Sequence, residues 1–313
     1  MNSRERFKTV MAHREADCIP YRMRLHEDLE KRFNEIYCSG KSYSEFFDDD
    51  IHHVNIDDEF IYPVTYEPYD FDNLPVPSNE SFDKMKQDVE ALHAKNKVVF
   101  NPYTPGIYET MTHLMHTEDV LEGMYWDSER LQEKIEKVAK WHIDLAVKKV
   151  KTGIDIMHIG DDLGTQESLI MSIDSYRKFY KPWHTELINQ IKKANPDVKV
   201  SFHFCGHVVS IIPELIDIGI DILETLQPEA NNDLGFIKKE YGKDLCFWGG
   251  IGMQSVFCGH PPEYVIEKVR EAIELLSPDG GYLCSPCHIA TPDVPPENIK
   301  AFYDALELYK HYK

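Results

Sequence analysis

The sequence predicts an α/β protein built as a (β/α)₈ TIM barrel with a helical and irregular N-terminal extension. Two observations favour this class. From about residue 98 onward, short apolar runs alternate with long amphipathic stretches, and parallel strands need such helical crossovers. The chain also has no GxGxxG or GxxxxGK[ST] loop of the kind common in open nucleotide-binding sheets. The barrel is therefore favoured over a doubly wound sheet.

The first 97 residues have a mixed pattern. It predicts an opening helix, a second helix within residues 25–37, and an irregular stretch over residues 57–78 that is acidic, aromatic and rich in proline. We expect a single domain over residues 1–313. Residues 1–97 form its N-terminal extension and first barrel elements.

Six strands are expected in the remainder of the chain, and amphipathic helices are expected to follow them. The strand runs are KVVFNPY (97–103), IDIMHIGDD (154–162), VKVSFHFCG (198–206), IDILETLQ (220–227), LCFWGGI (245–251) and GGYLCSPC (280–287). The helical runs cover residues 124–150, 172–194, 208–218, 235–243 and 262–276. Trp126 is expected in the core because it lies inside the first of these helices, and His207 is expected to open the third.

Composition and charge restrict the function classes. The chain has 313 residues, of which 42% are hydrophobic and 28% charged, as in folded, water-soluble proteins. Its formal charge of −20 repels nucleic acid and anionic membranes. No apolar run has the length of a membrane span and the N-terminus is too charged for a secretory signal, so we expect a cytoplasmic protein. Seven scattered cysteines indicate reduced thiols, some of them available as metal ligands.

Polar side chains gather where the predicted strands end. In a TIM barrel the active site lies at the carboxyl ends of the strands, so these positions are the candidates for chemistry. They are Asn101, Tyr103 and Thr104; Asp161, Asp162, Thr165 and Gln166; His203 and Cys205; Glu224 and Gln227; Trp248 and Gln254; and Cys284, Cys287 and His288.

A metal site is one interpretation of these ends. His203 and Cys205 are two residues apart, so on a strand their side chains point to the same side. Cysteine and histidine are ligands that zinc prefers, and a third donor is available from Cys287 or His288. Glu224 either completes the coordination or orients a ligand. The alternatives are a packed His-Cys pair and a solvated carboxylate at Glu224.

Substrate contacts are expected from other strand ends. Asp162 and Gln166 are candidates to hold a polar substrate group or to take a proton, whereas Asp161 is interpreted as a turn residue. Tyr103 and Trp248 are candidates for a pocket wall, with core packing as the alternative.

Five segments resemble the uroporphyrinogen decarboxylase superfamily, in the same order and over nearly the whole chain. They are RERFKTVMAHREADCIP, GDDLGTQESLIMSIDSYRKFYKPW, FHFCGHVVSIIPELIDIGIDILETLQP, LCFWGGIGMQ and GGYLCSPCHIATPDVPPENI. The resemblance implies a (β/α)₈ barrel. It also implies one of two activities, since the superfamily contains decarboxylases and corrinoid-dependent methyltransferases.

The decarboxylase branch is matched weakly. Its pattern RQAGR, which follows the N-terminal proline, supplies two arginines for a substrate with many carboxylates. In PYRMRLHEDL, Arg24 matches the first arginine, but Glu27 and Asp28 stand where the second should be. In favour of this branch, Asp57 lies near the position of its pyrrole-binding aspartate.

The methyltransferase branch is matched better. Its members carry H-x-C and a much later cysteine that together bind zinc, and His203 and Cys205 match the first part. Counting back from PPEN places the late ligand on His288, whereas the residue type points to Cys287. The glutamate ligand of the family is about two positions out of register with Glu224.

The resemblance therefore implies a methyltransferase that moves a methyl group from a small methylated compound, such as a methyl ether or methoxy-aromatic, to a separate corrinoid protein. Zinc is the implied Lewis acid, and Asp162, Gln166 and Gln227 are expected to position the substrate. Three alternatives remain: methyl transfer from the corrinoid to a thiol, decarboxylation of a porphyrinogen without metal, and a barrel that has lost catalysis and serves as a binding subunit.

Overall fold

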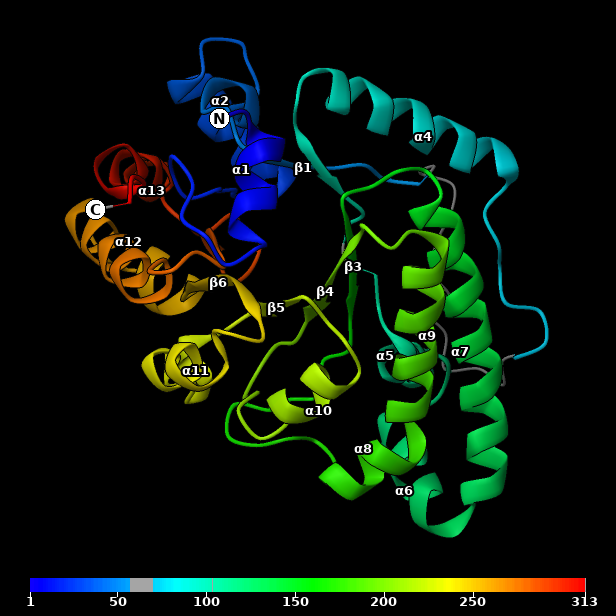
Figure 1. Ribbon diagram of the computed structural model, residues 1–313. Helices are drawn as coiled ribbons and strands as arrows, with labels where there is room; N and C mark the ends of the chain where they lie inside the picture. The colour runs from blue at the N-terminus through cyan, green and yellow to red at the C-terminus, as the bar shows by residue number, and fades with distance from the viewer. Residues whose placement is uncertain (57–69, 103, 313) are drawn as a thin grey trace. The chain divides into compact units, whose positions relative to one another are not determined.

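The computed structural model describes residues 1–56, 70–102 and 104–312 (Figure 1). It divides into two compact units. Unit 1 comprises residues 1–52, 96–98 and 222–313, and unit 2 comprises residues 53–95 and 99–221. Within each unit, parallel strands alternate with helices, so the predicted α/β class is confirmed. The expectation of one domain over residues 1–313 stays a prediction.

Unit 2 contains the parallel strands β3 (Ile156–Gly160) and β4 (Lys199–His203). Their register runs from Ile156 opposite Lys199 to Gly160 opposite His203, and Phe100 of β2 (Val98–Phe100) pairs with Ile156. The three strands are almost entirely buried, as their apolar composition requires. Because Gly160 and His203 are paired, the loops that follow β3 and β4 begin at the same edge of the sheet.

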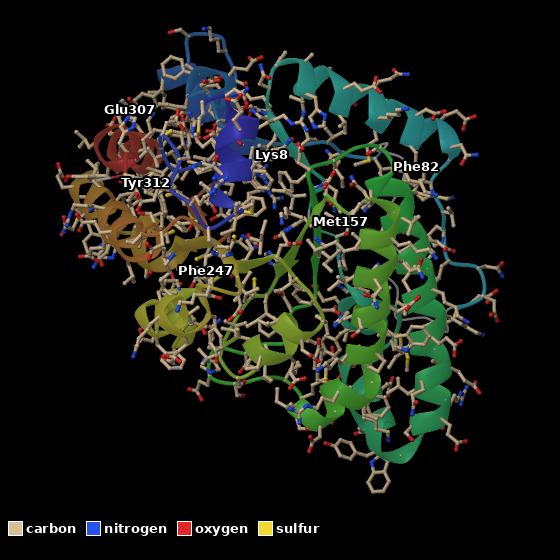
Figure 2. All side chains as sticks on the ribbon, viewed as in Figure 1. Lys8, Phe82, Met157, Phe247, Glu307 and Tyr312 are labelled. Carbon is tan, nitrogen blue, oxygen red and sulfur yellow. The ribbon has the colours of Figure 1, made fainter. Side chains whose placement is uncertain are left out.

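Seven helices accompany these strands in the described part of unit 2. They are α4 (Asn79–Ala94), α5 (Ile107–Leu114), α6 (Thr117–Trp126), α7 (Ser128–Val150), α8 (Ile173–Phe179), α9 (Lys181–Ala194) and α10 (Ile212–Asp217). The long helices α7 and α9 lie side by side (Figure 1). Phe82 of α4 packs against Trp141 and Leu145 of α7 (Figure 2). Trp141 Nε1 donates a hydrogen bond of 2.7 Å to the carbonyl of Pro75, which fastens the irregular segment 70–78 to α7.

Two predicted helices are each divided into two. The run 124–150 is interrupted at Asp127, whose φ of −143° and ψ of 52° are not helical. The run 172–194 is interrupted at Tyr180, and Pro182 in the first turn of α9 favours a new helix start there.

Two expectations for single residues are wrong. Trp126 is 85% exposed rather than in the core, because α6 buries Val120 and Met124 on its other side. His207 does not open a helix, because α10 begins only at Ile212. Pro213 follows in the first turn of α10, a position that proline favours.

Unit 1 contains the parallel strands β5 (Ile222–Thr225), β6 (Cys246–Ile251) and β7 (Tyr282–Pro286). Isolated parallel bridges join Tyr21 to Cys284 and Leu25 to Ala290, so the N-terminal segment extends the sheet beyond β7. Phe247 of β6 is fully buried in the core of this unit (Figure 2). The helices are α1 (Ser3–Val10), α2 (Glu27–Tyr37), α3 (Tyr43–Phe46), α11 (Leu234–Tyr241), α12 (Pro262–Leu276) and α13 (Pro296–Tyr309), with short helices η1 (Pro228–Ala230) and η2 (Met253–Phe257).

All six predicted strands are present as β2 to β7. The prediction missed β1 (Ile51–His53), a strand of only three residues that carries two histidines. Among the helices of residues 1–56, 70–102 and 104–312, none combines the length and the apolar character that a membrane span needs.

Candidate functional site

A thiol, an imidazole and a carboxylate converge where β3 and β4 end. Cys205 Sγ lies 3.3 Å from His203 Nε2, and His203 Nε2 lies 3.8 Å from Asp162 Oδ1. The three donor atoms all lie within 4.8 Å of one another. His203 is buried, with 8% of its side chain exposed, whereas the Asp162 side chain is 36% exposed. The cluster therefore has a buried side and a side that a small ligand can reach.

The loops after β3 and β4 hold this cluster together. The Cys205 N–H donates a hydrogen bond of 2.8 Å to Asp162 Oδ1, and the His207 N–H donates one of 2.8 Å to the Thr165 carbonyl. Gly206 has a φ of +88°, and a Cβ there would lie 2.6 Å from the Thr165 carbonyl oxygen. Glycine is required at this position because of both the backbone conformation and the close approach of the loops.

Asp161 does not share the role of its neighbour. Its carboxylate is fully buried and accepts hydrogen bonds from the backbone N–H groups of Tyr108 at 3.1 Å and Glu109 at 2.9 Å. It also accepts one of 2.8 Å from His184 Nε2, and His184 Nδ1 is hydrogen-bonded to the Tyr176 hydroxyl at 3.1 Å. Asp161 thus caps the N-terminus of α5 instead of serving its own turn.

This cap presses the first turn of α5 against the end of β3. A Cβ at Gly106, the residue before α5, would lie 1.6 Å from the Gly160 carbonyl oxygen, so only glycine fits there. The same turn brings Glu109 to the cluster, where its Oε2 accepts a hydrogen bond of 3.3 Å from the Asp162 N–H. Burial, reinforced by the nearby carboxylates of Asp161 and Asp162, raises the pKa of Glu109 to about 8.

A second histidine lies beside His203. His158 of β3 is buried, its Nδ1 lies 3.1 Å from Ser201 Oγ, and its ring contacts that of His203 edge to face at 5.7 Å. Neither His158 nor Glu109 was among the residues predicted from the sequence to form the site. His158 lies inside a strand run rather than at its end, and Glu109 has only the ordinary signal of an acidic residue in the first turn of a helix.

The other predicted site residues lie in several places. Gln166 is exposed in the loop after β3. In unit 1, Trp248 is buried in β6, opposite Glu224 of β5 in the strand register, and Glu224 and Gln227 are partly buried. Tyr103 and Asp57 lie outside the described residues.

The two candidates for the late ligand differ in exposure. Cys287 is buried in unit 1, and its Sγ donates to the Leu226 carbonyl at 3.7 Å. His288 is exposed. A contribution of either residue to a metal site stays a prediction.

A family model described as uroporphyrinogen decarboxylase (URO-D) matches residues 56–309, so the chain belongs to the uroporphyrinogen decarboxylase family. Two curated relatives named uroporphyrinogen decarboxylase show how distant the similarity is. The protein of Hydrogenobaculum is 24% identical over 184 residues, and that of Chlorobaculum parvum is 26% identical over 191 residues. Each alignment covers 59% of this chain, and the chain spans 50% of the length of each relative.

A solved structure described as a methyltransferase from Methanosarcina mazei has a similar fold. It matches with a TM-score of 0.75 at 16% identity, covering 98% of this chain and 99% of its own. Together with the alternation of parallel strands and helices, this likeness confirms the predicted TIM-barrel-like α/β fold class.

Proposed function

We propose that the protein is a corrinoid-dependent methyltransferase. It takes a methyl group from a small methylated compound, such as a methyl ether or methoxy-aromatic, and passes it to the cobalt of a separate corrinoid protein. The observation that carries the proposal is the cluster of His203, Cys205 and Asp162, because a metal-free decarboxylase has no need of a thiol and an imidazole in contact. The fold shared with the protein named as a methyltransferase supports the same class.

The donor atoms of the cluster fit zinc. With Zn–N and Zn–S distances of about 2.1 and 2.3 Å, neighbouring ligands of a tetrahedral site lie roughly 3.5 Å apart. The separations of 3.3 Å between Cys205 Sγ and His203 Nε2 and 3.8 Å between His203 Nε2 and Asp162 Oδ1 bracket this value. We therefore propose His203, Cys205 and Asp162 as ligands, with Cys287 or His288 as a further candidate. His158 orients the His203 ring through their edge-to-face contact.

The proposed reaction breaks the bond between the methyl carbon and its heteroatom. When bound, zinc supplies a Lewis acid that makes the heteroatom a better leaving group. The bonding electron pair leaves with the heteroatom, while the electron pair of cobalt(I) forms the new bond to the methyl carbon. Gln166 and Gln227 are proposed to hold polar groups of the substrate. The same ligands also suit the reverse direction, in which a thiol accepts the methyl group.

Decarboxylation of a porphyrinogen is the second candidate, and the names of the curated relatives favour it. Such a substrate carries many carboxylates, which a chain with a formal charge of −20 repels unless arginines gather at its site. The acidic pair Glu27 and Asp28, at the position of the second arginine of the decarboxylase pattern, argues against this activity.

One experiment separates the two candidates. The purified protein is assayed for bound zinc and then mixed with a cobalt(I) corrinoid protein and a series of methyl ethers, while the cobalamin spectrum is recorded. We expect stoichiometric zinc and conversion of the cobalt(I) spectrum to that of methylcobalamin with at least one donor. Absence of zinc combined with turnover of uroporphyrinogen would show that the methyltransferase assignment is wrong.

A further inference from the structure

Helices α5 and α6 form an extension of unit 2 between β2 and the crossover helix α7. A strand joined to its parallel neighbour needs only one crossover helix, so these two helices are additional. They follow the carboxyl end of β2 and lie at the end of unit 2 where the loops carrying Asp162 and Cys205 also lie (Figure 1). The hydrogen bonds from the first turn of α5 to Asp161 fasten the extension directly to the residue beside Asp162.

The last turn of α6 exposes two large aromatic side chains. Tyr125 is 74% exposed and Trp126 is 85% exposed, whereas Val120 and Met124 of the same helix are buried. Tyrosine and tryptophan each remove about 150–250 Å² of surface from water when they are buried. Covering both side chains with a partner would therefore contribute a large favourable free energy to binding. Exposed aromatic groups of this kind are typical of surfaces that bind a protein partner.

Acidic residues surround the aromatic pair. Glu118, Glu122 and Trp126 occupy positions i, i+4 and i+8 of α6 and therefore share one face, and both glutamates are exposed. Asp127 and Glu129 are exposed immediately beyond the helix. This charge repels an anionic membrane, and it repels a second copy of a chain whose formal charge is −20. It attracts lysine and arginine, which also bind the face of a tryptophan ring.

We propose that the tip of α6, formed by Tyr125 and Trp126 with the acidic residues around them, is the docking surface for the corrinoid-carrying protein. The partner presents basic residues to this surface. The inference rests on the proposed function and adds to it the surface that receives the methyl acceptor. Docking there brings the partner to the end of unit 2 where β3 and β4 present the candidate ligands.

A binding measurement tests the surface. A purified corrinoid protein reconstituted with cobalamin is titrated by calorimetry into the wild-type chain and into the double variant Tyr125→Ala/Trp126→Ala. Phe236→Ala is the matched control, because Phe236 is an exposed aromatic residue of α11 in unit 1 with 44% exposure. We expect the Kd to rise by about tenfold or more in the double variant and to stay within about twofold in the control. A Kd within about twofold of wild type in the double variant overturns the proposal.

Two further measurements distinguish this inference from the proposed function. Methyl transfer to free cob(I)alamin needs no docking surface, so its rate should be equal in the wild type and the double variant. Loss of this activity in the double variant would show that Tyr125 and Trp126 maintain the structure of the site, and would overturn the proposed docking surface. A wild type that transfers no methyl group to either acceptor contradicts the proposed function, and the calorimetric Kd still decides the docking surface. The proposed docking surface is also overturned if the chain binds phosphatidylglycerol vesicles, or associates with itself, in a way that depends on Trp126.

Discussion

Two pairs of adjacent aspartates stand at opposite ends of strands and have different environments. Asp49 and Asp50 directly precede β1, and both are buried. Asp161 and Asp162 directly follow β3, and only Asp161 is buried there, whereas Asp162 is 36% exposed. The same dipeptide is thus wholly buried at the amino end of one strand, whereas at the carboxyl end of another only its first member is buried and its second is partly exposed beside a thiol and an imidazole.

The pair before β1 is used entirely for packing within unit 1. Asp49 accepts a hydrogen bond of 3.1 Å from the Tyr303 hydroxyl of α13. Asp50 forms a buried ion pair with Arg6 of α1 and accepts a hydrogen bond of 3.3 Å from the Tyr21 N–H. These two carboxyl groups join the two terminal helices to the segment that extends the sheet beyond β7.

The side chains of Asp161 and Asp162 point in different directions because successive residues of an extended chain point to opposite sides. Asp161 turns inward to three donors that fix α5 and α9. Asp162 faces His203 and Cys205 instead. This agrees with the general location of active sites at the carboxyl ends of barrel strands, and with the association of the amino ends with stability.

The largest effect is expected from Cys205→Ala, which removes one proposed ligand at the carboxyl ends of the strands. Zinc affinity should fall by more than about 100-fold, since even changes around a metal ligand cost 10- to 100-fold. Methyl transfer should be abolished. The measurements are zinc content after dialysis against a chelator, and the rate of methylcobalamin formation.

Cys258→Ala is the matched control for this variant. Cys258 is also partly exposed, but its Sγ contacts Asp293 in unit 1. Equal zinc content in Cys205→Ala and Cys258→Ala would show that Cys205 is not a zinc ligand. The contrast between a structural aspartate pair before β1 and a metal-binding residue after β3 would then lose its main support.

A smaller effect, on stability, separates the two aspartates after β3. An asparagine at position 161 has only one acceptor oxygen, so its amide group must face a backbone N–H or the His184 N–H. We expect Asp161→Asn to lower the free energy of unfolding by about 3 kcal/mol. At position 162 the remaining oxygen can keep the bond from the Cys205 N–H, so Asp162→Asn should change stability by less than about 0.5 kcal/mol.

Two measurements test whether Asp161 contributes to stability and Asp162 to zinc binding: urea unfolding of both variants, and competition for zinc with a chelator. Asp162→Asn should weaken zinc binding while its unfolding curve stays close to that of the wild type. If Asp162→Asn instead destabilises the protein as much as Asp161→Asn does, both aspartates are structural and Asp162 is not a ligand.

The strands could be predicted from the sequence because buried parallel strands appear as continuous apolar runs, and all six runs became strands. The breaks at Asp127 and Tyr180 were missed because amphipathic periodicity continues across them. Trp126 was misplaced for a related reason: the periodicity identifies an apolar residue, whereas its exposure depends on which face of α6 contacts the rest of unit 2.

The sequence could identify candidate site residues that directly follow a predicted strand, as Asp162, His203 and Cys205 do. His203 and Cys205 share one side of a strand by spacing alone, and the structure brings them into contact. Glu109 reaches the same cluster from a helix more than ninety residues earlier, because Gly106 and Asp161 fasten α5 against β3. Such a contact depends on tertiary packing, which local sequence patterns do not predict.

The last effect is a pH dependence of stability and is expected at Asp49, where burial raises the pKa to about 8 from its ordinary value of 3.8. The folded state therefore holds this proton more tightly than the unfolded state. The resulting stability is fully present below pH 3.8 and is lost as the pH rises through 8, with a slope of at most about 1.4 kcal/mol per pH unit. Asp49→Asn cannot lose a proton and should lack this slope. Urea unfolding of both proteins from pH 5 to 8 measures the difference, and parallel curves would show that Asp49 stays ionised in the folded protein.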